Sequence, residues 1–158
     1  MSMDKQTVAR VRAAIKDRAV WFAFLYEEFA RRLPEAEVEK AARAAIFGFG
    51  RLKGQADVQP FDARAWVERH ERKGSAEVFD SDIEIGSGCA VQRMKHCALV
   101  EAWKELGCSD EKVALFCDIA MEGDRGRAAF HGIKMELNET IGKGDCFCRL
   151  TVTDEKAG

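Results

Sequence analysis

The sequence predicts an α+β fold, in which N-terminal helices precede an antiparallel sheet of roughly four strands. Apolar residues at helical spacing, three and four positions apart, occupy most of the first 74 positions. Alternating patterns typical of strands come only later, as two hairpins with two helical stretches between them. Since an isolated hairpin is only marginally stable, we expect the two hairpins to join in one sheet with helices on one face.

The length and charge of the chain indicate one domain and exclude some classes of partner. A length of 158 residues fits a single domain over 1–158, with a helical part over 4–74 and the sheet with its helices over 75–154. The net charge of −2 offers no general attraction to nucleic acid. No apolar run approaches the roughly 20 residues that span a bilayer, and the first residues lack the pattern of a signal peptide. We therefore expect a cytoplasmic protein that binds neither nucleic acid nor membrane.

Three helices are predicted in the N-terminal part. The first runs from Asp4 to about Arg32, the second from Pro34 to Gly54, and the third lies between Asp62, its N-cap, and Gly74, its stop. Gly48 and Gly50 fall inside the second helix, where each costs about 1 kcal/mol relative to alanine. They therefore predict close packing or the approach of a ligand at this point of the helix.

The first helix is apolar around much of its circumference. Its large apolar side chains are Trp21, Phe22, Phe24, Leu25, Tyr26 and Phe29. A helix that is apolar on more than one side needs more than one partner surface. We therefore expect burial on two sides, as in a homodimer interface.

The second half of the chain supplies the strands. Strand patterns cover 76–86, 88–96, 131–141 and 146–153, and helical patterns cover 98–107 and 109–122. In the last strand, alternation places Cys146, Cys148, Leu150 and Val152 on one face. That face is expected to be the covered one.

Six cysteines are present, and their role is the main question that the sequence raises. They are Cys89, Cys97, Cys108, Cys117, Cys146 and Cys148. Without an export signal we expect reduced thiols, and a free cysteine is most often a small buried side chain. A disulfide between Cys146 and Cys148 is excluded in an intact strand, because their side chains would stand about 6.6 Å apart. Packing, a metal site and a reaction centre remain as alternatives.

Several residues near these thiols could carry chemistry. Asp118 follows Cys117 on an apolar helix; it either faces water or lies at the lip of a pocket, where burial would raise its pKa and suit it to acid–base work. Cys97 follows His96 at a helix start, where the helix dipole can lower the pKa of a thiol. His131, ahead of a strand, is either an acid–base group or an ordinary loop residue.

Two further hypotheses concern a substrate and a metal. Arg51 lies near the end of the second helix, where its guanidinium could pair with a substrate carboxylate or simply be solvated. Cys97, Cys117 and Cys148, with His96 or His131, could bind zinc or iron tetrahedrally. The chain has no C-x-x-C pair, so structural zinc is disfavoured, while a catalytic metal stays open.

Four stretches of the sequence together resemble the L-2-amino-thiazoline-4-carboxylic acid hydrolase family. They are "FGRLKGQ" from Phe49, "HCALVEAWKELG" from His96, "FCDIAM" from Phe116 and "GDCFCRLTV" from Gly144. By this resemblance the family cysteines fall on Cys97, Cys117 and Cys148, and Cys146 falls on a variable position. One departure is Arg149, which stands where the family often has an acidic residue.

The resemblance implies hydrolysis of a 2-amino-thiazoline-4-carboxylate ring to N-carbamoyl-cysteine. Such a reaction needs an activated nucleophile, donors for the developing charge and an acid for the leaving sulfur. It implies Cys117 or Cys148 as nucleophile or ligand, Asp118 as the acid–base group and His131 as a proton shuttle. Arg51 would hold the carboxylate of a small-molecule substrate, with Cys97 and His96 nearby.

Two other hypotheses compete with an enzyme. The same thiol-lined pocket could serve a non-catalytic domain that binds a small ligand or a metal, or senses redox state. Alternatively, the thiols only pack in the core of a small α+β dimer. The shared site requires the two helices of the second half to pack on the sheet face that carries Cys148.

Overall fold

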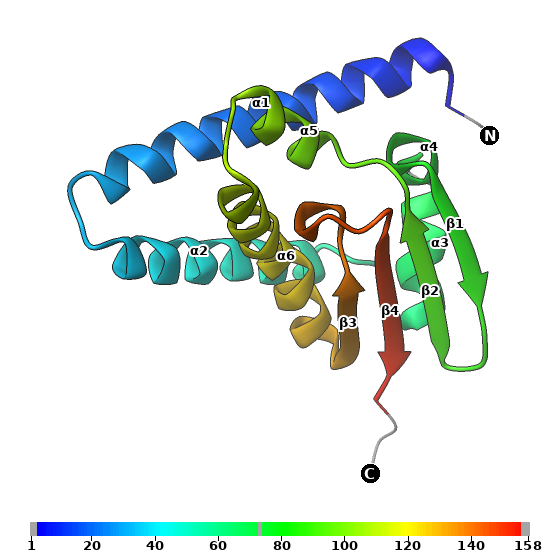
Figure 1. The fold of residues 1–158 in the computed structure, drawn as a ribbon. Helices are drawn as coiled ribbons and strands as arrows, with labels where there is room; N and C mark the ends of the chain where they lie inside the picture. The colour runs from blue at the N-terminus through cyan, green and yellow to red at the C-terminus, as the bar shows by residue number, and fades with distance from the viewer. Residues whose placement is uncertain (1–2, 73, 156–158) are drawn as a thin grey trace.

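The computed structural model describes residues 3–72 and 74–155, and its centre is one four-stranded antiparallel sheet (Figure 1). The strands are β1 (Ser81–Ile85), β2 (Cys89–Met94), β3 (Ile133–Glu139) and β4 (Cys148–Asp154), in the order β1-β2-β4-β3. Each hairpin therefore pairs its own two strands, and β2 pairs with β4 to join them. The predicted α+β fold with two joined hairpins is confirmed.

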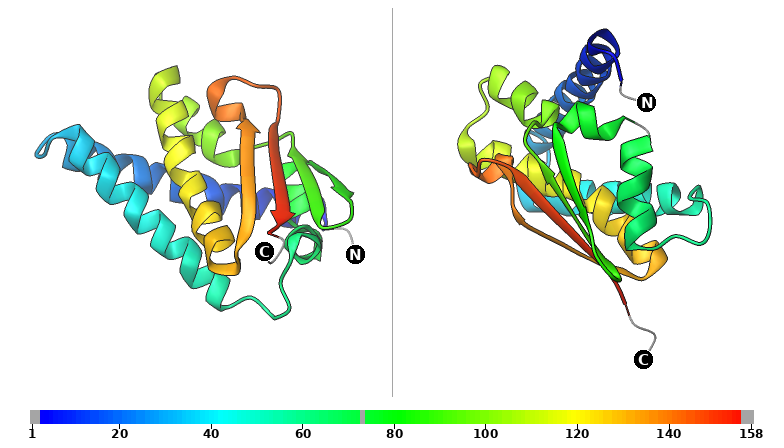
Figure 2. Two further views of the ribbon diagram at one scale, coloured as in Figure 1. Left: turned by 90° about the horizontal axis from the view of Figure 1, so that it is seen from below. Right: turned by 90° about the vertical axis from the view of Figure 1, so that its right-hand side faces the viewer.

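The two faces of the sheet differ in polarity, as alternation requires. Along β4, Cys148, Leu150 and Val152 are buried, whereas the Arg149 and Thr151 side chains between them lie on the other face. Figure 2 shows the helices gathered on one side of the sheet. The polar face is left to solvent, so all apolar burial by the sheet occurs against the helices.

Six helices are found in the described part of the chain. They are α1 (Lys5–Ala30), α2 (Glu35–Gln55), α3 (Ala63–Arg72), α4 (Ser75–Phe79), α5 (Ala98–Glu105) and α6 (Asp110–His131), and a 3-10 turn, η1 (Ile141–Lys143), precedes β4. As predicted, the side chain of Asp62 caps α3, accepting a hydrogen bond from the Ala65 N–H at 2.8 Å. None of the described helices is long and apolar enough to cross a bilayer.

The α2 and α6 helices pack with their backbones in contact, and glycines make this approach possible. A side chain at Gly50 would clash with the backbone carbonyl of Gly123, and one at Gly126 would clash with the carbonyl of Phe47. The prediction that Gly50 marks close packing is therefore confirmed. A side chain at Gly48, in contrast, would meet nothing within 4 Å.

Two apolar cores flank the inner face of the sheet. One lies among the helices α1, α5 and α6 and includes Tyr26, Trp103, Phe116 and Ile119. The other lies between the sheet and α3 and includes Trp66, Leu150 and Val152. The two cores leave a space between them, which is the site described below.

The largest differences from the sequence prediction lie at three places, and the strand expected over 131–141 begins only at Ile133. The α6 helix continues past position 122 to His131, because Gly123 and Gly126 allow it to pack closely on α2. It ends at Gly132, whose φ is 65°. Residues 75–79 form the short helix α4 instead of the start of a strand. The last strand begins at Cys148, so Cys146 is exposed and shares no strand face with it.

Candidate functional site

A cleft of about 370 Å³ opens between the two cores. It is bounded by α1, α2, α5, α6 and the inner face of the sheet. Its walls are mainly apolar and come from Phe22, Ile46, Phe79, Met94, Leu99, Trp103, Met121 and Leu150. A mostly apolar cleft with a few polar groups is the usual form of a small-molecule site.

Three thiols line this cleft. Cys97 is the N-cap of α5, Cys117 lies in the first half of α6, and Cys148 is the first residue of β4. The sulfurs are close enough that a negative charge on Cys97 or Cys148 raises the pKa of Cys117. The structure therefore brings together the three cysteines that the family resemblance implied.

The loop before β4 directs hydrogen-bond donors at two of these sulfurs. The N–H of Ile141 donates to the Cys148 sulfur at 3.3 Å. The Thr140 hydroxyl and the Gly142 N–H both approach the Cys117 sulfur and lower its pKa. Thr140 is itself buried, and its backbone N–H donates to Asp145 Oδ2 at 2.8 Å, which closes the loop. The donors are thus held in place by the loop rather than by the thiols.

Burial dominates the acidity of all three thiols. It raises the pKa of Cys117 to about 12 and that of Cys148 to about 11. The pKa of Cys97 is also raised by burial, although the N–H groups of Val100 and Leu99 work in the opposite direction. The expectation of a lowered pKa at Cys97 is therefore wrong, because desolvation outweighs the helix terminus. All three are neutral thiols near pH 7.

A second polar group in the cleft is a histidine on α3. His70 lines the cleft, and its Nδ1 lies 2.9 Å from the Oε1 atom of Gln92. Gln92 is fully buried on the inner face of β2, and its Nε2 donates to the Ser81 hydroxyl at 3.0 Å. Lys53 of α2 and Asp124 of α6 line the same part of the cleft.

The thiols and His70 occupy different ends of the cleft. Asp124, which interacts electrostatically with His70, lies seven residues after Cys117 on α6, about 10 Å along the helix. On the sheet, Cys148 pairs with Met94, and Leu150 pairs with Gln92. Gln92 therefore lies two residues along the strands from the level of Cys148, a distance of about 7 Å. A ligand in the cleft can therefore contact both ends.

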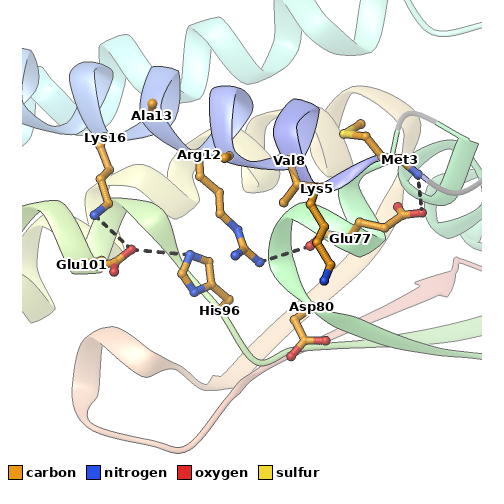
Figure 3. Close-up of a pocket in the computed structure, with 11 residues that line it drawn as sticks. Met3, Lys5, Val8, Arg12, Ala13, Lys16, Glu77, Asp80, His96 and Glu101 are labelled. Atoms are coloured by element: carbon orange, nitrogen blue, oxygen red, sulfur yellow. Dashed lines mark hydrogen bonds and ion pairs between the residues drawn. The ribbon is translucent and has the colours of Figure 1, made fainter.

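A second hollow, an open groove of about 760 Å³, lies between α1 and the α4 region. Figure 3 shows the residues that line it. His96 lines both the groove and the cleft, so its ring stands between them. Burial, together with the charges of Arg12 and Lys16, lowers the pKa of His96. In the groove, Arg12 donates to backbone carbonyls, and Lys16 pairs with Glu101 at 3.2 Å. Because these cations already have partners, the cleft is the better candidate site.

The comparisons with known proteins agree with the resemblance noted in the sequence. The family model for L-2-amino-thiazoline-4-carboxylic acid hydrolase matches residues 12–152. The chain belongs to this family. No curated protein matches the chain.

A solved structure with a similar fold comes from a different functional context. It is a trafficking protein particle complex subunit 3 from Naegleria fowleri, covalently bound to palmitic acid. The match has a TM-score of 0.57 at 9% identity and covers 91% of this chain and 96% of that chain. At this identity the likeness shows a common fold and nothing more.

Asp118, expected at the lip of the pocket, does not line the cleft of this family member. Its carboxylate forms ion pairs with Arg43 and Arg125, each at 2.7 Å. Burial tends to raise the pKa of Asp118, but the hydrogen bonds from Arg125 and Arg43 outweigh it and lower the pKa. The expectation of a raised pKa is therefore wrong, because two guanidinium groups stabilise the charged form.

His131 and Arg51 also lie away from the cleft. His131 ends α6, and its Nε2 lies 2.9 Å from Asp57, which also binds Arg127 and Arg69 in a buried charged cluster. The ring of His131 stacks on Phe61 with centroids 4.2 Å apart. Arg51 is exposed, with its guanidinium over the ring of Phe130. Neither residue is placed to touch a ligand in the cleft.

The described residues contain no group of three or more His, Cys, Asp and Glu side chains arranged as metal ligands. The cysteines are all free thiols. Among the ionisable residues that line the cleft, His96 and the three thiols were named from the sequence, whereas Arg18, Lys53, His70 and Asp124 were missed. These four residues lie on four helices, α1, α2, α3 and α6, whose packing no short motif encodes. In the sequence, His70 is only one more polar residue of a charged helix.

Proposed function

We propose that this chain is a hydrolase that opens a ring of the 2-amino-thiazoline-4-carboxylate type to N-carbamoyl-cysteine. The observation that carries the proposal is the convergence of Cys97, Cys117 and Cys148 on one apolar cleft. Donors directed at the sulfurs of Cys117 and Cys148 add to it, because hydrogen bonds to sulfur favour the thiolate. Membership of the hydrolase family supplies the class of reaction.

In this proposal Cys117 is the nucleophile. Its sulfur adds to the ring carbon between nitrogen and sulfur, the bond from that carbon to the ring sulfur breaks, and the Cys117 proton passes to the ring sulfur. Water then adds to the same carbon and displaces Cys117, which regains a proton. One water is consumed, and N-carbamoyl-cysteine leaves.

The high pKa of Cys117 has two opposite effects on the first of these two steps. It lowers the fraction of attacking thiolate, but it also decides which sulfur leaves the tetrahedral centre. A sulfur with a pKa of about 12 leaves a tetrahedral centre more slowly than the substrate's own sulfur, whose pKa resembles that of free cysteine. Ring opening is therefore preferred over return to substrate. The same property slows the second step, because Cys117 must leave there.

For the substrate carboxylate we propose Arg18 in place of Arg51. Arg18 lines the cleft and is exposed, so it lies at the mouth. Its positive charge also acts on Cys97, lowering the pKa of that thiol. An arginine at the mouth, with thiols inside, would orient a small carboxylate substrate with its ring toward Cys117.

The test is turnover of 2-amino-thiazoline-4-carboxylate by the purified chain, with N-carbamoyl-cysteine measured by mass spectrometry. We expect steady product formation by the wild type and a rise of KM of about tenfold or more in Arg18→Ala, the cost of a lost charge-assisted hydrogen bond. No product above the uncatalysed rate from the wild type would refute the proposed activity.

A second candidate function is the holding of a fatty acyl group at the same cleft without turnover, as a thioester that a cleft cysteine forms by exchange with an acyl thioester, whose own thiol leaves. The apolar walls of the cleft favour it. The structure of similar fold that is covalently bound to palmitic acid makes an acyl group the ligand to look for. Mass spectrometry of the intact purified chain, before and after hydroxylamine, would detect such a thioester. A loaded chain that opens no ring would favour this function over hydrolysis.

We also propose that the chain forms a homodimer in the cytoplasm through the outer face of α1. Trp21 and Phe24 are 69% and 68% exposed, and Leu25 and Phe29 extend the same face. An apolar patch of this kind marks an interaction surface. The free thiols are consistent with a reducing compartment. Analytical ultracentrifugation should give a dimer for the wild type and a monomer for the double variant Trp21→Glu, Phe24→Glu.

A further inference from the structure

Gln92 is a polar side chain where the sheet is otherwise apolar. It has no exposed surface, and its neighbours on the inner face, Ala90 of the same strand and Leu150 of β4, are buried apolar residues. Burying an amide is costly unless its polar atoms are hydrogen-bonded. Both ends of Gln92 have partners, Ser81 at Nε2 and His70 at Oε1. The buried amide therefore connects the edge strand to the histidine of the cleft.

This arrangement selects the tautomer of the neutral His70 ring. Because Gln92 Nε2 donates to the Ser81 hydroxyl, its Oε1 faces His70 and can only accept a hydrogen bond. His70 Nδ1 then carries a hydrogen, and in the neutral ring, which burial favours, Nε2 keeps its lone pair. A neutral imidazole held in one tautomer is the form that accepts a proton.

Charged groups around His70 make that proton transfer feasible. Asp124 of α6 stabilises the protonated ring, whereas Lys53 of α2 and Arg127 of α6 oppose it. Burial is the largest influence and lowers the pKa of His70, and the bond to Gln92 partly offsets it. The ring is therefore neutral near pH 7 and has a carboxylate nearby when it takes up a proton.

The spacing of the cleft fits a small ring between His70 and the thiols. Asp124, which acts electrostatically on His70, lies about 10 Å along α6 from Cys117. A separation of this order leaves room for a small ring beside Cys117 and for one water between that ring and His70. Attack from the Cys117 end thus leaves the opposite face of the ring toward His70.

We propose that His70 is a catalytic residue, the general base that activates water in the second half of the reaction, and that Gln92 is its positioning residue. This inference rests on the proposed ring-opening function. After ring opening, the ring carbon is bonded to Cys117, and water attacks it from the His70 side.

In that step His70 Nε2 takes one proton from the water as its oxygen bonds to carbon. The bond from carbon to the Cys117 sulfur breaks, and the electron pair stays on sulfur. The resulting thiolate is held by the Thr140 hydroxyl and the Gly142 N–H. The imidazolium then loses its proton to solvent, and the thiolate takes one up, so that both groups return to their starting states.

The test compares His70→Gln with His131→Gln, a matched control at a buried histidine outside the cleft. We expect His70→Gln to lower kcat about 100-fold or more, and to accumulate the opened substrate on Cys117, seen by mass spectrometry of the quenched enzyme. Gln92→Leu should lower kcat less, about tenfold. His131→Gln, assayed below its unfolding temperature, should keep the wild-type kcat and show no accumulation.

The outcomes separate this inference from the proposed function. If the wild type opens no ring, the proposed function fails. If the wild type turns over and His70→Gln does so equally well, or slows without accumulating the adduct, only the role of His70 is overturned. The pH dependence of kcat of the wild type gives a second test, which needs no variant. Because kcat reports the substrate-bound enzyme, its acid limb should coincide with the ¹⁵N NMR titration of His70 in the chain that carries the adduct on Cys117, and should lie below pH 6.5. An acid limb with a different midpoint would overturn the role.

Discussion

Gly142 packs directly against Cys117, and a β-carbon at position 142 would lie 2.6 Å from the Cys117 sulfur. This contact places the N–H donor of Gly142 at the thiol while leaving no room for a side chain. Gly142→Ala should therefore displace Cys117 and lower kcat/KM about tenfold or more, with destabilisation of about 1–3 kcal/mol from overpacking. Steady-state kinetics and denaturant unfolding measure both effects.

Gly48 offers the matched control for that substitution. A side chain there would meet nothing within 4 Å, and alanine suits a helix interior better than glycine. Gly48→Ala should keep kcat/KM and raise stability by up to about 1 kcal/mol. Equal activity of Gly142→Ala and Gly48→Ala would contradict the proposed contact of Gly142 with the reacting sulfur.

The buried thiols predict a loss of stability at alkaline pH. The pKa of Cys117 is raised to about 12 and that of Cys148 to about 11, whereas a thiol in the unfolded chain ionises near pH 9. Above that pH the unfolded state loses protons that the folded state keeps, so the free energy of unfolding falls as pH rises. Each thiol contributes up to about 1.4 kcal/mol per pH unit.

Denaturant unfolding between about pH 9 and about pH 11 measures this slope. In Cys117→Ala the free energy of unfolding should fall less steeply with pH, because one buried thiol is removed. The control is Cys146→Ala, which removes an exposed thiol. Identical slopes for the two variants would mean that Cys117 ionises as readily in the folded chain as in the unfolded one.

Alkylation should separate the cysteines by burial. Cys146 is exposed, whereas Cys117 and Cys148 are buried and neutral near pH 7. Iodoacetamide should label Cys146 first, and Cys117 and Cys148 at least about tenfold more slowly, because only the thiolate reacts. Peptide mapping by mass spectrometry reads out the order. Labelling of Cys117 as fast as Cys146 in the folded chain would indicate an activated thiolate and contradict the burial-raised pKa.

The cluster around Asp57 is predicted to stabilise the fold and to take no part in catalysis. Its carboxylate is buried and accepts two hydrogen bonds of 2.7 Å from Arg127. Asp57→Asn should cost about 3–5 kcal/mol, because Arg127 is left buried without its charged partner. Asp118→Asn, at a carboxylate with a side chain about one third exposed, should cost only about 1 kcal/mol.

Thermal unfolding and steady-state kinetics, measured on the same samples, test Asp57→Asn and Asp118→Asn. Both variants should retain wild-type kcat/KM while folded, since neither Asp57 nor Asp118 lines the cleft. A large loss of kcat in Asp118→Asn at unchanged stability would restore the acid–base role that the sequence suggested.

The fold was largely predictable from the sequence, because periodicity reports on local structure. The two hairpins, the cap at Asp62 and the inward face of Cys148 and Leu150 all followed from spacing. The errors came where tertiary packing overrides local preference. The helical pattern recognised in the sequence stopped at position 122, whereas Gly123 and Gly126 allow α6 to continue in contact with α2.

The candidate site was predictable only in part. The thiols of Cys97, Cys117 and Cys148 were found through their resemblance to a family, and the structure gathers them in one cleft. His70 was not found, because its role depends on a hydrogen bond to Gln92, 22 residues away. Asp118 was misjudged, because its arginine partners come from α2 and from two turns further along α6. Sequence spacing does not encode such long-range partners.

The most direct test of a Cys117-dependent hydrolase is a paired assay of Cys117→Ala and Cys146→Ala. Formation of N-carbamoyl-cysteine from 2-amino-thiazoline-4-carboxylate is measured with both variants and the wild type at equal concentrations of folded protein. Cys146→Ala should match the wild type, and Cys117→Ala should lose activity about 1,000-fold or more, as expected for a missing nucleophile. Equal product formation by Cys117→Ala and Cys146→Ala would contradict a reaction at Cys117.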